Sequence, residues 1–570
     1  MRPPPVGRLL VLLVVMMLGL TDVMARLSIL QVREGGSYEE RGYSQRLHTF
    51  TLPAQRGSIL DASRQPLALS VEARDVYADP RFVEDADATA AAIAPVLGLK
   101  VGEVRASVAA DGSFSYVARQ VDLSVAQRLE AMQLPGIGFL PVPKRSYPDG
   151  PLAAQLLGYV GTDGDGLAGL EYQYQSMLQG TPGQLRQEMS PSGQPIAYGV
   201  DEMSAPVPGN DLVTTLDRQF QYQVQAALAS AVRANHAKGG TVIVMDPHTG
   251  DVYAMASSPG FNANAFAQAD EEARRNSALV DAFEPGSVNK VITAAAAIQE
   301  HAVALNRRFE VPDHMLVSGF TIHDSHPHPI EDMTLGDIIA ESSNIGAAKV
   351  AQRVGPETLS SYLERFGFGR TTGTGFPGET PGVVPPLADW SDASLATIAY
   401  GQGLAVSPMQ MASVYATIAN HGTWVQPRLA SGVIDGDGVF HPADAAPTRR
   451  VISSATADTV TRMLASAVQD GTGTLAQIPG YQVAGKTGTA LKVDPRTGRY
   501  GRKYVASFIG FLPASDPQVV IAAIIDEPTT IYGGIASAPL FQQLARYSIQ
   551  RLGITPGEPV APPPSAQGLR

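Results

Sequence analysis

Ser287 and Lys290 stand three residues apart at the beginning of an apolar stretch, "EPGSVNKVITAAAAIQE", which runs from Glu284 to Glu300. A serine hydroxyl is a weak nucleophile at neutral pH and needs an adjacent base. A lysine can be that base only when it is neutral, and burial favours the neutral form. Residues three apart share one helix face, so the spacing predicts a serine nucleophile beside a lysine base. It equally fits a helix-capping serine followed by a lysine that extends to the surface.

Two further motifs favour the catalytic interpretation. "ESSNIG" places Ser342 and Asn344 at the start of a helix. "GKTGTA" places four residues on a strand, which are Lys486, Thr487, Gly488 and Thr489. Each motif alone can be explained as a helix cap or an edge-strand lysine. The order Ser-x-x-Lys, Ser-x-Asn, Lys-Thr-Gly is typical of penicillin-binding proteins and serine β-lactamases.

The surrounding elements must bring these three motifs together. Pro285 and Gly286 indicate the start of a helix that is apolar on nearly all sides and therefore buried. Residues 239–257 alternate as two apolar runs around a turn at 247–250, which predicts a β-hairpin. Alanine-rich helices follow to about Asn420, and three strand-like runs close the domain. The pattern predicts an α+β fold in which an antiparallel sheet packs against a helical cluster.

The residues that flank the three motifs resemble one protein family. "NSALVDAFEPGSVNKVITAAAAI", "SSNIGAAKVAQRVG" and "VAGKTGTALKV" are similar to segments of the division-type class B penicillin-binding proteins, the FtsI-type D,D-transpeptidases. "QRGSILDASRQPLALSVEARDVYADP" resembles the family's non-catalytic pedestal module. The resemblance extends from about Arg26 to Arg551. It implies a penicillin-binding transpeptidase fold behind a mostly β pedestal domain and one N-terminal transmembrane helix.

The resemblance also implies the reaction. The expected enzyme is a peptidoglycan D,D-transpeptidase that cross-links stem peptides ending in D-Ala-D-Ala during septal cell-wall synthesis. Its acyl-enzyme would form on Ser287, and β-lactams would acylate the same serine. By family analogy Lys290 is the base, Ser342 relays a proton to the leaving D-alanine, and Asn344 orients Lys290 and the substrate amide.

The strand motif is expected to bind the substrate. Lys486 would remain charged and hold the substrate carboxylate together with Thr487 and Thr489. Gly488 has no side chain, so the substrate could approach the strand closely. The oxyanion needs two converging N–H donors, which by family analogy are those of Ser287 and Thr489.

Composition narrows the possible classes of protein. A formal net charge of −12 over 570 residues argues against a nucleic-acid-binding surface. Because there is no cysteine, disulfides, thiolate catalysis and cysteine-ligated metal sites are excluded. Three histidines in "HDSHPHP", His323 to Pro329, could bind zinc, but the reaction needs no metal. We expect a loop above the cleft there, with no cofactor and no metal site.

The N-terminus predicts a membrane anchor. An apolar run begins at Leu9 and continues, with a polar interruption near Asp22, to Leu30. This is the ~20-residue length that a membrane-spanning helix needs. Arg2 and Arg8 precede it, so the short tail should stay in the cytoplasm and the rest should be exported. A cleaved signal peptide is the alternative, although no convincing cleavage site follows.

We therefore expect five segments in chain order. They are a cytoplasmic tail (1–8), a transmembrane anchor (9–30), a dimerisation-type pedestal (31–205), a transpeptidase domain (206–552) and a disordered Pro-rich tail (553–570). The protein would lie in the plasma (inner) membrane as a single-pass protein, with its catalytic domain outside the cytoplasm.

The expected partners are stem peptides, β-lactam antibiotics and the membrane, and no nucleic acid. By family analogy they include a polytopic membrane glycosyltransferase and other division proteins. Alternatives are an elongation-type class B protein, a serine β-lactamase or penicillin sensor, and a scaffold for the glycosyltransferase. The large N-terminal module argues against a β-lactamase, and the complete catalytic set argues against a scaffold alone. "DAFEPGS" and its flanks favour the division-type assignment.

Overall fold

A computed structural model describes residues 6–190, 196–494, 496–530 and 532–562. Its contacts divide the chain into two compact units. The first combines Met1–Gln55 with Gly180–Pro208, and the second combines Arg56–Gln179 with Gly209–Arg570. This grouping cuts across the expected linear domains, whose boundaries remain a prediction.

The first unit begins with a long apolar helix, α1 (Val6–Ser28), which continues as a π-helical turn, Ile29–Arg33. Within Val6–Arg33, the most apolar 18 consecutive residues have a mean hydropathy of 2.1, and none of these residues is buried within the protein. This stretch is therefore long and apolar enough to cross a membrane as a single-pass anchor. Helix α2 (Gly35–Arg46) follows. A three-stranded antiparallel sheet completes the unit, with strands β1 (Leu47–Leu52), β6 (Gly183–Glu188) and β7 (Asp201–Ser204).

The second unit contains a seven-stranded sheet made from distant parts of the chain. Its order is β17 (Phe440–Pro442), β16 (Ala430–Ile434), β8 (Asp211–Thr214), β2 (Ile59–Leu60), β3 (Pro66–Ala78) and β4 (Ser115–Asp122), with β5 (Ile137–Ser146) also paired to β3. Apolar side chains of β3 and β4 pack against three helices, α3 (Ala86–Leu97), α4 (Val101–Val108) and α5 (Leu123–Glu130). Residues upstream of 80 and downstream of 429 thus share one sheet.

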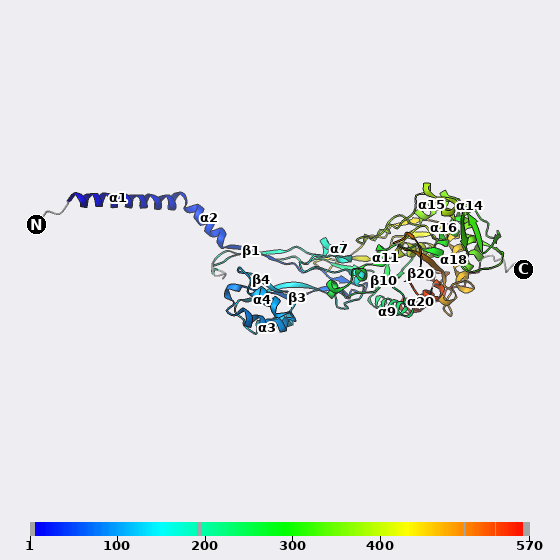
Figure 1. The fold of residues 1–570 in the computed structure, drawn as a ribbon, viewed down its shortest axis with the longest axis horizontal. Helices are drawn as coiled ribbons and strands as arrows, with labels where there is room; N and C mark the ends of the chain where they lie inside the picture. The colour runs from blue at the N-terminus through cyan, green and yellow to red at the C-terminus, as the bar shows by residue number, and fades with distance from the viewer. Residues whose placement is uncertain (1–5, 191–195, 495, 531, 563–570) are drawn as a thin grey trace. The chain divides into compact units, whose positions relative to one another are not determined.

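A five-stranded antiparallel sheet forms the centre of the same unit. Its order is β10 (Val252–Ser258), β9 (Gly239–Met245), β21 (Val519–Asp526), β20 (Arg499–Leu512) and β19 (Ala484–Asp494). One face packs against α9 (Arg218–Ala234) and α20 (Ala538–Leu552), which lie together in Figure 1. The other face packs against the helical cluster. This arrangement confirms the predicted α+β fold.

The helical cluster is rich in buried alanine. It contains α12 (Lys290–Gln299), α13 (Leu335–Glu341), α14 (Asn344–Val354), α15 (Pro356–Arg365), α16 (Asp392–Ala399), α17 (Pro408–Ala419) and α18 (Ser454–Gln469). Figure 1 labels α14, α15, α16 and α18 close together. Residues 294–297 of α12 are all alanine and almost fully buried, so neighbouring helices can approach closely. Capping boxes begin α13, α16 and α17, which fixes where each helix starts.

Shorter elements connect these layers. They are helices α6 (Ala154–Leu157), α7 (Gly169–Gln173), α8 (Gln175–Leu178), α10 (Glu271–Arg274), α11 (Ser277–Val280) and α19 (Gly533–Ala536). Three small antiparallel pairs complete the unit, which are β11 (Phe309–Val311) with β14 (Glu331–Met333), β12 (His314–Val317) with β13 (Phe320–His323), and β15 (Thr423–Val425) with β18 (Thr448–Arg450).

Candidate active site

Ser287 lies in a single 3₁₀ turn, η4 (Gly286–Asn289), that leads directly into α12. Gly286 adopts the left-handed conformation, with φ at +59°, which a side chain would strain. Its N–H donates to the carbonyl of Gly401 at 2.9 Å, which anchors the turn to the cluster. The sequence predicted an α-helix start at Ser287, whereas the α-helix proper starts at Lys290.

The amine of Lys290 contacts three other predicted site residues. Its Nζ lies 3.0 Å from Ser287 Oγ, 2.9 Å from Asn344 Oδ1 and 3.3 Å from Ser342 Oγ, and it also contacts the Ser342 carbonyl. The Asn344 amide is oriented because its Nδ2 donates to the His323 carbonyl at 2.9 Å. Oδ1 of Asn344 and the carbonyl of Ser342 can only accept hydrogen bonds. A neutral amine can donate one N–H to each of them, and its lone pair then faces the Ser287 hydroxyl.

The electrostatic surroundings favour that neutral amine. Lys290 is fully buried. Burial, followed by the charge of Lys486, lowers the pKa of Lys290 well below its usual range, while the nearby Asp324 carboxylate opposes this shift. The arrangement can therefore take a proton from a serine at neutral pH.

The Ser-x-Asn motif lies at the junction of two helices. Ser342 ends α13 in the left-handed conformation, with φ at +65°, and Ser343 begins α14 as its N-cap. The Ser343 hydroxyl accepts the N–H of Gly346 at 2.8 Å, as an N-cap serine does. The sharp junction allows both the carbonyl and the hydroxyl of Ser342 to contact Lys290.

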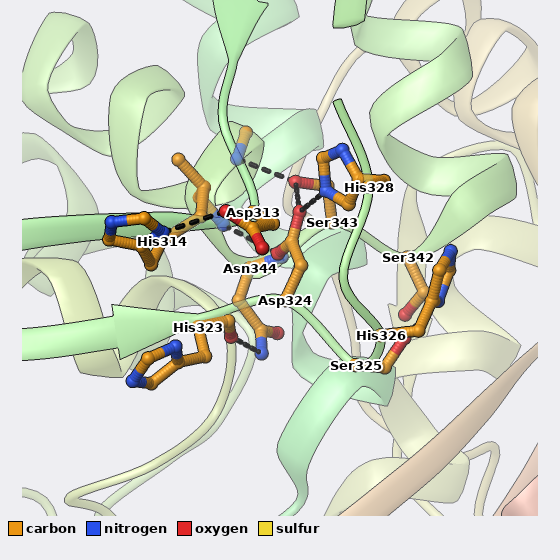
Figure 2. Close-up of polar contacts among 12 residues, drawn as sticks. Asp313, His314, His323, Asp324, Ser325, His326, His328, Ser342, Ser343 and Asn344 are labelled. Carbon is orange, nitrogen blue, oxygen red and sulfur yellow. Dashed lines mark hydrogen bonds and ion pairs between the residues drawn. The ribbon is translucent and has the colours of Figure 1, made fainter. Parts of the chain in front are cut away.

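Asp324 holds the first turn of α14, as Figure 2 shows. Its Oδ1 accepts the N–H groups of Asn344 at 2.5 Å and Ile345 at 3.0 Å. Its Oδ2 accepts the Ser343 hydroxyl at 2.6 Å. A carboxylate is stabilised at a helix N-terminus by the free N–H groups and the helix dipole. Asp324 thereby fixes the position of the residue that orients Lys290.

Lys486 is the second fully buried lysine of the site. Its Nζ lies 3.3 Å from the hydroxyls of Thr472 and Thr487, and these two hydroxyls are 2.8 Å apart. Burial lowers the pKa of Lys486 to about 7, against the opposing charge of Glu341. Its charge is therefore only partly compensated by the protein, which suits an anionic ligand.

Gly488 and Thr489 complete the strand motif. A Cβ at Gly488 would lie 2.3 Å from Ser507 Oγ and 3.0 Å from Val288 Cγ1, so the glycine lets β19 pack against the turn that carries Ser287. This packing is an additional reason for a glycine, beside the predicted approach of substrate. The Thr489 hydroxyl accepts the N–H of Gly533 at 3.1 Å.

The structure thus brings the predicted residues together in two groups. Ser287, Ser342 and Asn344 meet at Lys290, and Lys486 meets Thr487 beside Thr472. No hydrogen bond joins the two groups among the residues that the structure describes, although the charge of Lys486 acts on Lys290. Sequence reasoning missed Thr472 and Asp324. The available signals were weak, since one residue lies in a glycine-flanked "GTGT" and the other in the histidine-containing loop.

The histidines of that loop do not form a metal cluster. Within the described ranges, no group of three histidine, aspartate or glutamate side chains is arranged to hold a metal ion. His314 contacts Asp313, and His328 contacts Asp324, as Figure 2 shows. Only His328 reaches the carboxylate that holds α14.

Comparisons with known proteins agree with this geometry. Residues 240–546 match the penicillin binding protein transpeptidase domain, and residues 51–214 match the penicillin-binding protein dimerisation domain. The chain belongs to the penicillin-binding protein transpeptidase family. The match covers more than half of the chain and includes every predicted catalytic residue.

Two relatives of this family are similar over nearly the whole chain. Penicillin-binding protein PbpB of Mycolicibacterium smegmatis is 34% identical, over 95% of this chain and 89% of its own length. Peptidoglycan D,D-transpeptidase FtsI of Escherichia coli K12 is 33% identical, over 95% of this chain and 91% of its own length.

A solved structure agrees with both relatives. Penicillin binding protein 3 of Mycobacterium tuberculosis, complexed with aztreonam, matches with a TM-score of 0.72 and 31% identity, over 90% of this chain and 100% of its own. The predicted family and fold are confirmed, and the protein is a peptidoglycan D,D-transpeptidase of the serine acyltransferase type.

Proposed function

We propose that Ser287 is the acylated nucleophile of this D,D-transpeptidase and that Lys290 is its general base. The observation that carries the proposal is the set of oxygens around Lys290. Two acceptor-only oxygens can take the two N–H groups of a neutral amine, which leaves its lone pair for the proton of the Ser287 hydroxyl, whose Oγ lies 3.0 Å from Nζ. The depressed pKa of Lys290 supports the same state.

The first half-reaction forms the acyl-enzyme. The Ser287 proton moves to Lys290 as Oγ attacks the carbonyl carbon of the penultimate D-alanine of a stem peptide. The peptide bond then breaks, and the terminal D-alanine leaves with a proton that passes through the Ser342 hydroxyl. That hydroxyl lies 3.3 Å from Lys290 Nζ, within reach of a relay. By family analogy, the backbone N–H groups of Ser287 and Thr489 stabilise the oxyanion.

Lys486 and its threonines select the substrate. A D-alanine carboxylate beside Nζ would supply the negative charge that the protein itself leaves incomplete, and the hydroxyls of Thr487 and Thr489 would hydrogen-bond to it. Thr489 would then share its oxygen with the N–H of Gly533. The pKa of Lys486 would rise on binding, because an opposite charge favours the protonated amine.

The second half-reaction completes the cross-link. The neutral amine of a neighbouring stem peptide attacks the ester carbonyl on Ser287, and Lys290 takes the proton that the amine loses. The ester bond to Ser287 then breaks as the new peptide bond forms, and Lys290 returns that proton to Ser287 Oγ. A β-lactam resembles the D-Ala-D-Ala ending and would acylate Ser287 in the same way. The mycobacterial relative crystallised with aztreonam supports this extension.

The decisive experiment is peptide mapping of the full-length protein after penicillin treatment. We expect one adduct, on the peptide that contains Ser287, and none in the Ser287→Ala variant. An adduct on Ser342, or labelling that survives Ser287→Ala, contradicts the assignment.

We also propose a septal role and a membrane arrangement to match it. Two observations support cell-wall synthesis at the septum rather than during elongation. They are the similarity to the relative named FtsI and the division-type sequence around Ser287. Helix α1 would anchor the protein in the plasma membrane, with the catalytic unit outside the cytoplasm. Depletion in cells should give filaments with unfinished septa, whereas rounded cells would favour the elongation role.

A polytopic glycosyltransferase of the division machinery is the proposed partner. Helix α1 carries Asp22 and Arg26, which are costly in lipid and often face another protein. Replacing α1 by an unrelated span should spare penicillin labelling and weaken co-purification with the glycosyltransferase. If the swapped protein co-purifies equally well, α1 is only an anchor. Ser287→Ala should retain the partner while losing the label.

A further inference from the structure

His328 is a titratable side chain that none of the proposed chemical steps uses. It lies in the loop between β13 and β14, and its side chain is only 7% exposed. Figure 2 shows its ring beside Asp324 and Ser343. Nδ1 lies 2.7 Å from the carbonyl oxygen of Pro329, and Nε2 lies 3.2 Å from Oδ2 of Asp324.

These contacts indicate which protonation state the ring adopts. A carbonyl oxygen can only accept a hydrogen bond, and both oxygens of Asp324 already accept bonds from α14. A neutral imidazole has one N–H and would leave its second nitrogen facing an oxygen lone pair. An imidazolium donates to both oxygens. Burial lowers the pKa of His328, but the Pro329 carbonyl and the Asp324 carboxylate together raise it above its ordinary value.

A continuous set of contacts leads from this ring to the base. Asp324 holds the N–H of Asn344, and the side chain of Asn344 holds Lys290. The Asp324 charge also acts directly on Lys290 by favouring its protonated form. Among the described residues, His328 is the only cationic group paired with Asp324.

We propose that His328 is a positioning residue of the acylation step. As an imidazolium it holds the Asp324 carboxylate against the first turn of α14 and offsets the charge that Lys290 experiences. When the ring loses its proton, the carboxylate holds α14 less firmly and Lys290 retains its own proton more strongly. Both effects slow acylation. The inference rests on the proposed role of Lys290 as the base.

Other charged groups lie near the His328 ring and also affect its protonation. Glu331 on β14 favours the charged ring, as Asp324 does. Asp313, which precedes β12, interacts with His328 electrostatically. The His326 ring lies 5.8 Å away and is exposed, and its one hydrogen-bond partner within the described part of the chain is its neighbour Ser325. His326 is therefore a matched control, because it shares the loop but not the contact with Asp324.

The test is the pH dependence of acylation in the full-length protein in detergent. The second-order rate constant for a fluorescent penicillin is measured from about pH 5.5 to 9 for wild type, His328→Gln and His326→Gln. In wild type the acid limb reports the protonation of Lys290. We expect His328→Gln to move this limb to higher pH and to slow acylation at neutral pH by roughly five- to tenfold. His326→Gln should follow the wild-type profile.

A second variant predicts a shift of the opposite sign. Asp324→Asn removes the negative charge, so the acid limb should move to lower pH even though the maximal rate falls. A purely structural role for the loop would lower rates without moving the limb in opposite directions. Unshifted limbs in both variants, or a shift of His328→Gln to lower pH, overturn the proposal.

The proposal can still be tested if the two variants do not fold. In that case the ring of His328 is titrated in the wild type by NMR of protein labelled at its histidines. The pKa of His328 is raised in the folded protein, so the ring should lose its proton only above the ordinary histidine value of ~6.5. A ring that titrates at or below that value overturns the proposal. Labelling of Ser287→Ala would instead overturn the proposed function, so the two failures are distinguishable.

Discussion

Lys290 and Lys486 are both fully buried, and burial lowers the pKa of both, yet their surroundings are different. Lys290 has two acceptor-only oxygens and two hydroxyls around its amine. Among the described residues, the hydrogen-bond partners of Lys486 Nζ are all threonine oxygens, at 3.3–3.4 Å. The oxygens around Lys290 satisfy the hydrogen bonds of a neutral amine without any ligand. The threonine oxygens around Lys486 carry no charge and do not balance a protonated amine. The same residue type can thus be a base or an anion receptor according to the oxygens around it.

Exchange of Lys290 for arginine should give the largest effect. A guanidinium stays protonated at neutral pH and cannot accept the Ser287 proton. We expect acylation by penicillin to fall by about 10³-fold or more, measured as the second-order rate constant. Retention of a tenth of the wild-type rate by Lys290→Arg would show that another group is the base.

The matching change at Lys486 should cost less. Arginine keeps the charge that a carboxylate needs, although a planar guanidinium does not reproduce the contacts of a single ammonium with Thr472 and Thr487. We expect Lys486→Arg to lose about 10- to 100-fold in the same measurement. Equal losses in the two variants would mean that the comparison between the lysines divides their roles wrongly.

The pH dependence of carboxylate recognition can sharpen the comparison. Because the pKa of Lys486 is about 7, the free enzyme loses this charge as pH rises above that value. We expect the rate advantage of a penicillin over its methyl ester to fall by roughly tenfold between about pH 7 and 8.5. A ratio that stays constant would show that Lys486 remains charged throughout this range.

The smallest expected effect is on stability. The pKa of Lys290 is depressed in the folded protein, so the unfolded chain binds more protons and the burial penalty is present at neutral pH. The penalty decreases as pH rises towards the ordinary lysine value. Lys290→Met should therefore raise the melting temperature at neutral pH by ~2–4 °C while abolishing acylation. Lys100→Met, at an 86% exposed side chain, is the control and should change little.

The residues that carry chemistry could be predicted because their types are rare at such positions. No single serine, lysine or threonine indicates a site, but the order of the three motifs along the chain does. The structure places Ser287, Lys290, Ser342 and Asn344 in direct contact. The sheet-and-helix fold also followed from apolar patterning. Asp324 could not be predicted as the residue that holds α14, because it lies in a histidine-containing loop and its partners lie about twenty residues away.

Contacts between segments that are far apart in the sequence could not be predicted either. Thr472 meets Lys486 only because α18 and β19 pack together, and no local pattern reports that contact. Strand β16 pairs with β8 across more than two hundred residues. Short strands carry little periodic signal, so sequence reasoning could place linear domains but could not detect a shared sheet.

That shared sheet has a consequence for how the chain folds as it is made. Strand β8 pairs with β2 on one side and with β16 on the other. Until residues 430–434 have been synthesised, one edge of β8 has no partner, and an unpaired edge invites association with other chains. Pairing over such a separation is also slow, because a long loop must close first. If the segment is translocated from its N-terminus, a nascent chain would wait outside the cytoplasm with this edge open, which is the stage at which a periplasmic or cell-surface chaperone would be most useful.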